Sequence, residues 1–144
     1  MNYNELAAEF LHKMRVLRKV TSHRNISEAL QGEAFVLRFI HCHKGDVLPS
    51  EISNEMEVSS ARVAAALNSL ENKGLITRQI DPSDRRKILV RLTAKGREVA
   101  ERHYREVIAD TANLLQQLGE QDAKEYVRLV GRLGEIALPQ KELL

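Results

Sequence analysis

The sequence has few of the residues that cross-link or rigidify a fold. Its 144 residues include one cysteine, three prolines, seven glycines and no tryptophan. A single cysteine excludes a disulfide within the chain and suits a reducing compartment. Long apolar runs are also missing: none approaches the roughly 18 residues of a membrane span, and the first residues lack the apolar core of a signal peptide. We therefore expect a cytoplasmic protein that stays out of the membrane.

The motifs that mark common catalytic sites are missing too. The chain has no Gly-rich phosphate loop, no HExxH sequence and no nucleophile elbow. Scattered carboxylates are the only groups left for acid–base chemistry, and no pattern brings them together. The sequence therefore predicts neither an enzyme nor a bound cofactor.

What the chain does have is aliphatic bulk and an uneven distribution of charge. Hydrophobic residues make up 43% of it, which is enough to bury a core in one domain. Residues 60–97 carry nine Lys or Arg against three Asp or Glu, a net charge of +6, whereas residues 1–59 and 98–144 carry −1 and −3. Positive charge gathered in one segment is typical of a surface that binds a polyanion.

The basic segment overlaps a stretch that reads as helix, turn and helix. Pro49 suits the first position of the first helix, and Ser59 or Ser60 can cap the second. In the second helix, apolar residues recur at spacings of four and three and predict an inward stripe: Val63, Leu67 and Leu70. The small, polar or cationic residues of the opposite face are Ser60, Arg62, Ala65 and Asn68. Gly74 is a stop signal at the end of this helix.

After Gly74 the hydrophobic period changes from 3.6 to 2. Residues 75–80 and 88–92 alternate apolar and polar side chains, which predicts two strands. The segment 81–87 between them is a turn signal that ends in three consecutive cations, Arg85, Arg86 and Lys87. Alone, such a run is more often a solvated turn. Directly after a helix-turn-helix, it predicts a basic wing that reaches phosphates or the minor groove.

The two motifs together carry a family resemblance. The run DRRKILVRLT at 84–93 resembles the D-x-R…L-T wing signature of MarR-type regulators, and LENKGLI at 70–76 is similar to the exit of that family's recognition helix. The order of helices before and after fits as well. The resemblance implies one mainly α domain over 1–144 with a small β-wing. A winged helix-turn-helix occupies about 27–97, and dimerisation helices occupy about 1–22 and 98–144.

The resemblance also implies a function. MarR-type proteins are sequence-specific DNA-binding transcriptional regulators, and we expect a repressor that binds a pseudo-palindromic operator as a homodimer and is released by a small-molecule effector. The partners implied are double-stranded DNA, a second copy of the chain and that effector. Arg86 is then the wing arginine that contacts DNA and Asp84 orients it, although Asp84 could equally serve only to cap the turn. Arg85 and Lys87 would bind phosphates.

On the recognition helix, the types of the outward residues limit which DNA bases the side chains can contact directly. Arg62 is the only long cation on the outward face, so it is the best candidate for a guanine contact. Ala65 can meet a thymine methyl but forms no hydrogen bond, and we expect DNA shape to supply much of the specificity. The full set of candidate DNA-binding residues is Ser59, Ser60, Arg62, Ala65, Asn68, Asp84, Arg85, Arg86 and Lys87.

Another segment, residues 34–40, is apolar on nearly all sides of a helix. Such a helix is expected to be buried at the centre of the domain. Ser27 can cap it, and Gly45 is a stop signal at its end.

The flanking segments read as long amphipathic helices. Residues 3–22, 94–118 and 121–137 each have an apolar stripe at helical spacing, and Thr93 can cap the second of them. One winged helix cannot cover that much apolar surface, which favours burial in a twofold dimer. The alternative is a self-contained helical bundle. The predicted dimer contacts are Leu6, Phe10, Leu114, Leu118, Leu129, Leu133 and Ile136.

Sensing is less well defined by the sequence. Ligands of MarR-type proteins occupy a crevice between the dimerisation helices and the winged domain, and His12, Arg15, Phe39 and His43 are candidates there, or ordinary surface and core. The histidines and Cys42 also suggest a metal-responsive or redox-responsive variant. However, His41 and His43 point about 200° apart on a helix, so no metal site is predicted, and Cys42 is expected to be a buried structural thiol. The remaining alternative is a winged helix that docks an acidic protein.

Overall fold

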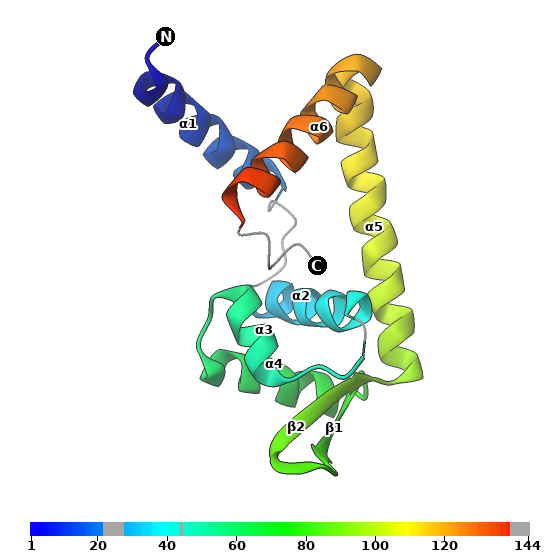
Figure 1. Cartoon of the computed structure of the whole chain (residues 1–144). Coiled ribbons are helices and arrows are strands. Elements are labelled where there is room, and N and C mark those ends of the chain that lie inside the picture. The colour runs from blue at the N-terminus through cyan, green and yellow to red at the C-terminus, as the bar shows by residue number, and fades with distance from the viewer. Residues whose placement is uncertain (22–27, 44, 139–144) are drawn as a thin grey trace.

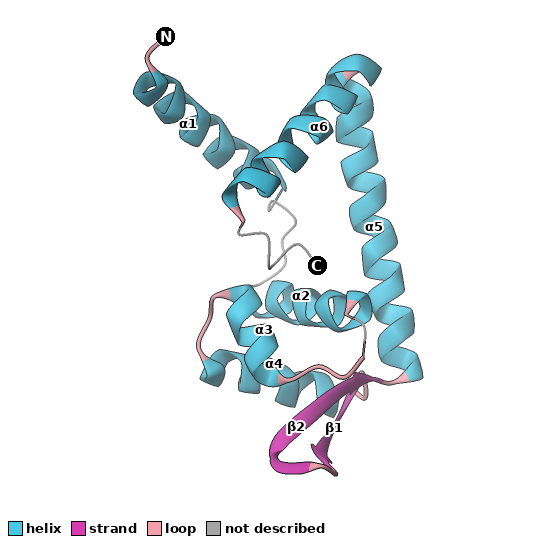
Figure 2. Cartoon of the chain, in the orientation of Figure 1, coloured by secondary structure: helices cyan, strands magenta, loops and turns pink. Residues whose placement is uncertain are grey.

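The structure is a computed structural model that describes residues 1–21, 28–43 and 45–138. Within these residues it contains six helices and a two-stranded antiparallel sheet (Figure 2). The elements in chain order are α1 (Tyr3–Thr21), α2 (Glu28–Cys42), α3 (Pro49–Met56), α4 (Ser60–Asn72), β1 (Ile76–Asp81), β2 (Asp84–Leu92), α5 (Ala94–Leu118) and α6 (Glu120–Ala137). This is the predicted mainly α fold with a small β-wing.

The core lies around α2, which packs against α4, α5 and β2. Val36, Leu37 and Ile40 project from it into a cluster that is closed to solvent. The predicted inward stripe of α4 enters the same cluster, with Val63, Leu67 and Leu70 at most 2% exposed. A helix that is apolar on most sides therefore occupies the centre of the domain, as predicted.

The helix-turn-helix is defined by its caps. The Glu51 carboxylate accepts a hydrogen bond from the Leu48 backbone N–H at 2.8 Å, which satisfies a donor at the start of α3. Ser59 caps α4, because its hydroxyl oxygen accepts from the Arg62 N–H at 3.2 Å. At the other end Gly74 adopts φ 72°, a left-handed conformation that glycine accommodates without strain.

The wing is longer than the sequence predicted. In the sheet, Ile76 of β1 lies opposite Leu92 of β2, Ile80 lies opposite Ile88, and Asp81 lies opposite Asp84. Residues 84–87 therefore belong to strand β2, and only Pro82 and Ser83 form the turn. Alternation of apolar and polar residues stops at the basic run, and for this reason the pattern did not indicate a strand there. Val47, which lies between α2 and α3, bridges to Val90 through its backbone.

The wing and α5 meet at an unusually close contact. Thr93 caps α5 by accepting from the Gly96 N–H at 3.0 Å, and its own N–H donates to the Leu75 carbonyl at 3.0 Å. This places Gly96 directly on the Leu75 carbonyl. A Cβ at position 96 would lie 1.8 Å from that oxygen, so only glycine fits there.

α1, α6 and the far half of α5 lie on the side of α2 away from the wing. Figure 1 shows α5 rising from the wing to the far side of the molecule, where α6 folds back beside it and α1 lies apart from α2. Differences from the predicted bounds are small: α2 ends at Cys42 instead of near Gly45, and α6 begins at Glu120 instead of Gln121. The predicted cap Ser27 and the end of the first helix at residue 22 lie outside the described residues.

Candidate nucleic-acid interface

The outward face of α4 is small and polar. Ser60, Arg62, Ala65 and Asn68 are all exposed, while the opposite side of the helix is buried in the core. Ser59 is exposed as well, but its hydroxyl oxygen is engaged in the helix cap. Because most side chains on this face are short, the backbone of α4 can approach another surface closely.

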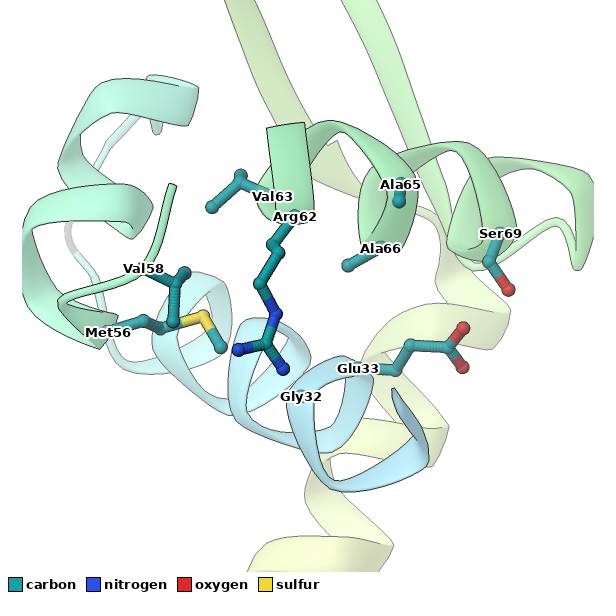
Figure 3. Close-up of a pocket in the computed structure, with 9 residues that line it drawn as sticks. All are labelled: Gly32, Glu33, Met56, Val58, Arg62, Val63, Ala65, Ala66 and Ser69. Carbon is teal, nitrogen blue, oxygen red and sulfur yellow. The ribbon is translucent and has the colours of Figure 1, made fainter. Parts of the chain in front are cut away.

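Arg62 lies on the flank of α4 that faces α2. It lines a cavity of about 480 Å³ between the two helices, and Figure 3 shows its side chain directed toward Gly32 instead of away from the protein. The apolar side chains of the lining are Met56, Val58, Val63, Ala65 and Ala66. A guanine contact by Arg62 therefore requires a change of rotamer from the one in this structure.

Arg86 on the wing is held by Asp84. The Asp84 carboxylate accepts from both the backbone N–H and the Nε of Arg86, at 3.1 and 3.2 Å. Asp84 thus contacts both the backbone and the guanidinium group of Arg86. The carboxylate that accepts from the turn residue Ser83 is instead that of Asp81. The hydrogen bonds from Arg86 hold the pKa of Asp84 below its ordinary value, so the carboxylate stays charged at neutral pH. The Arg86 side chain remains 91% exposed and available to a partner.

The rest of the wing combines charge with an apolar pair. Arg85 and Lys87 are exposed, as the sequence predicted for a basic wing. Ile80 and Ile88 face each other across the strands and are 65% and 43% exposed. This pair was not predicted from the sequence, because the register that joins the two isoleucines is not visible before the strands are aligned.

Two ion pairs fix the wing relative to the helices. Arg78 of β1 donates to both carboxylate oxygens of Glu71 on α4, at 3.2 and 3.1 Å. Arg91 of β2 donates to Asp46 at 2.6 Å. Each contact lowers the pKa of its carboxyl group below the ordinary value, since the hydrogen bond from the arginine favours the charged form.

The Glu71–Arg78 pair leads to a prediction about pH. A carboxyl group whose pKa is lowered by folding stabilises the folded state above its ordinary pKa of about 4.5, and this contribution is lost as the pH falls through the lowered value. We expect Glu71→Gln to be less stable than the unsubstituted chain at pH 7, and we expect the difference to shrink as the pH falls below about 4.5. Urea unfolding over this pH range measures the difference. A difference that does not change with pH would show that the charge of Glu71 is not involved.

The predicted dimer residues share one property, exposure of a large apolar side chain. The exposed fractions lie between 41% and 73% for Leu6, Phe10, Leu114, Leu118, Leu129, Leu133 and Ile136. They come from α1, the distal half of α5 and α6, which also expose Tyr3, Leu11, Val127 and Val130. An apolar surface of this extent on one lobe is typical of an interface.

The sensing candidates fall into two separate places within one chain. Arg15 lies 3.4 Å from the His12 ring on α1, whereas the rings of Phe39 and His43 lie 5.6 Å apart at the end of α2. Cys42 is exposed, so the expectation of a buried thiol was wrong: it follows the last apolar residues of α2 and lies on the outer side of the helix end. No cluster of three potential metal ligands occurs among the described residues.

The arrangement defines a class of protein. A capped helix-turn-helix presents one helix outward, and a basic two-stranded wing lies at the same end of the molecule (Figure 1). This is the architecture of a winged-helix DNA-binding protein. Among the described helices, none is both long and apolar enough to cross a membrane.

Comparison with known proteins shows which proteins the chain is similar to. A model described as the MarR family matches residues 29–87. The chain is 26% identical over 129 residues to the HTH-type transcriptional regulator YwhA of Bacillus subtilis, covering 88% of each chain. Its structure is similar to that of YusO from the same organism, at 26% identity and a TM-score of 0.66, over 95% of this chain and all of that one. FabT of Streptococcus pneumoniae, solved in complex with DNA, is 26% identical, with a TM-score of 0.65 over 93% and 94% of the chains.

The chain is therefore similar to MarR-type winged-helix transcriptional regulators, through the family match over residues 29–87 and through its fold. The relatives are regulators and not enzymes, which agrees with the lack of catalytic motifs in the sequence.

Proposed function

We propose that this regulator binds a pseudo-palindromic DNA site as a homodimer, with α4 in the major groove and the wing on the neighbouring backbone or minor groove. The observation that carries the proposal is that α4, with its exposed small-residue face, and the wing, whose Arg86 is exposed, lie at the same end of the molecule (Figure 1). The net charge of +6 on residues 60–97 supports it, because phosphate contacts dominate the affinity of such proteins for DNA.

The contacts in this proposal follow from the residue types. Asn68 and Ser60 can donate to and accept from base edges, Ala65 can meet a thymine methyl group, and Arg62 can pair with guanine after leaving its cavity. Arg85, Arg86 and Lys87 would neutralise phosphates. Because few side chains on α4 are able to read bases directly, DNA shape would supply a large share of the specificity.

The homodimer in this proposal is supported by the apolar surface on α1, α5 and α6. Burial of each leucine-sized side chain contributes roughly 1.5–3 kcal/mol, so a handful of them is enough to hold two copies together. In a twofold dimer the two α4 helices would meet half-sites one helical turn apart. Repression, release by a small-molecule effector and a cytoplasmic location complete the proposal, and each rests on the resemblance to the family.

The experiment that tests this function is selection from a pool of random duplexes. We expect enrichment of an inverted repeat, bound with two chains per duplex. Arg62→Ala should then relax one base position in each half-site and weaken binding by about 1–3 kcal/mol per half-site. If no sequence is enriched, sequence-specific binding is wrong. A winged helix that docks an acidic protein would then be the better account.

The contact between Asp84 and Arg86 predicts the direction in which Asp84→Ala changes the affinity for DNA. Removing a negative charge from the wing should by itself strengthen DNA binding. We expect the opposite for Asp84→Ala, a loss of about threefold to tenfold, because the carboxylate holds Arg86 in place through two hydrogen bonds. Fluorescence anisotropy with the selected duplex measures the affinity.

The matched control is Asp81→Ala, which removes a carboxylate from the same wing. The Asp81 carboxylate accepts from the backbone N–H and the hydroxyl of Ser83 and also interacts with the Asp84 backbone and Lys87. None of its described contacts is with the Arg86 side chain. This variant should bind DNA as tightly as the unsubstituted chain or more tightly. If Asp84→Ala behaves like Asp81→Ala, Asp84 does not position Arg86.

A further inference from the structure

A polar cavity lies where α2, β2 and the start of α5 meet, away from the outward face of α4. Its volume is about 280 Å³. His41 and His43 line it from the end of α2, Arg91 from β2 and Arg97 from the first turns of α5. Four basic side chains from three parts of the fold thus surround one space, although they are distant from one another in the sequence.

The charge lining this cavity is predominantly positive. Asp46 is the one carboxylate among its described lining residues, and Arg91 engages it at 2.6 Å. That pair is neutral, which leaves the charge of Arg97 uncompensated by the other described residues of the lining. Arg97 also lies near the N-terminus of α5, where the helix dipole adds positive potential. The cavity is therefore electrostatically suited to an anion.

The two histidines leave hydrogen-bonding capacity unused. The Nδ1 atoms of His41 and His43 are buried and have no hydrogen-bond partner among the described residues. Because these two nitrogens have almost no accessible surface, they do not face the cavity, and the histidine rings form part of its wall. Beside His43, Glu51 places a carboxylate oxygen 3.9 Å from Nε2.

We propose that this cavity binds a small oxyanion, a phosphate or carboxylate group, with Arg97 as its main ligand and Arg91 as a further donor. Guanidinium groups suit both anions because they present paired N–H donors in one plane. The site joins α2, the base of the wing and α5. An anion there would neutralise the positive groups that these elements bring together and so stabilise the folded protein.

The test uses the full chain without DNA, so that its result does not depend on the proposed DNA function. Inorganic phosphate and acetate are titrated separately at constant ionic strength, and the melting temperature and the arginine Nε–Hε NMR signals are followed. We expect a saturable rise in melting temperature with at least one of the two, together with a shift of the Arg97 signal. Arg97→Gln should weaken the binding about tenfold.

Two variants sharpen the test. Asp46→Asn removes the carboxylate that competes for Arg91, so it should bind the anion several-fold more tightly even though it breaks an ion pair. Arg102→Gln on α5 removes one positive charge from a residue that does not line the cavity and should leave the binding unchanged. Equal responses in all three variants, or no saturable response in the unsubstituted chain, would overturn the proposal.

A phosphate of bound DNA offers the same chemistry as a free anion, and a second arm separates the two sources. Duplex binding is measured with Arg97→Gln in the absence of phosphate. We expect no loss of DNA affinity beyond that of Arg102→Gln. A larger loss, together with no response to free phosphate, would assign Arg97 to the DNA backbone and refute the cavity as a site for small anions.

Discussion

Replacing Leu133 by aspartate is expected to convert the protein to a monomer and to lower its affinity for a palindromic duplex by roughly 10²-fold or more. Leu133 is 55% exposed on the apolar face of α6 and is one of the predicted dimer contacts. A charge in that interface would be buried without a partner, which is costly. Each monomer could then bind only one half-site, and the gain from linking two half-sites would disappear.

The control places the same residue elsewhere on the same helix. The control variant is Gly131→Asp. Position 131 lies about 200° around α6 from Leu133, and a Cβ there meets nothing within 4 Å in the structure. Light scattering coupled to size exclusion should show a dimer for Gly131→Asp and a monomer for Leu133→Asp. Circular dichroism checks that both remain helical. A dimeric Leu133→Asp would mean that α6 does not form the interface.

The second large effect is expected at Gly96, where one added methyl group should destabilise the fold by roughly 2–4 kcal/mol. The Cβ of Gly96→Ala would lie 1.8 Å from the Leu75 carbonyl oxygen, which itself accepts from Thr93. Because the obstacle is backbone, it cannot rotate away. Either α5 or the start of β1 must shift, and with them the contact between wing and core.

Gly131→Ala is the matched control for this substitution. The position is helical and open, so alanine should stabilise the helix by about 0.5–1 kcal/mol. Chemical unfolding of the two variants should therefore give changes of opposite sign. A Gly96→Ala chain as stable as the unsubstituted one would show that the close approach to Leu75 is not maintained in solution.

Local patterns in the sequence were sufficient for the elements that position the site. The caps at Ser59 and Thr93, the stop at Gly74 and the inward stripe of α4 were all predicted, because each depends on residues within one or two turns of helix. The change of period after Gly74 located the wing for the same reason. These features are enough to define the winged-helix class.

Contacts between distant residues were not predictable in this way. The Asp46–Arg91 pair joins residues 45 apart, and the space required at Gly96 is set by the Leu75 carbonyl. The Arg62 side chain points toward α2, and the periodicity of α4 alone does not indicate where α2 lies. Cys42 was predicted to be a buried structural thiol, but it is exposed, because the side of α2 on which it lies is not set by the sequence near it.

The central claim, that the wing and α4 bind DNA, is tested most directly by the salt dependence of duplex affinity. The comparison is between the unsubstituted chain, Arg86→Ala and Arg105→Ala, an arginine of α5 outside the wing. With two wings per dimer, Arg86→Ala should lower the slope of log affinity against log salt by about 2 and weaken binding at least tenfold at low salt. Arg105→Ala should match the unsubstituted chain. Identical affinities and slopes for all three proteins would contradict the account, because the highly exposed arginine of the wing would then make no contact with DNA.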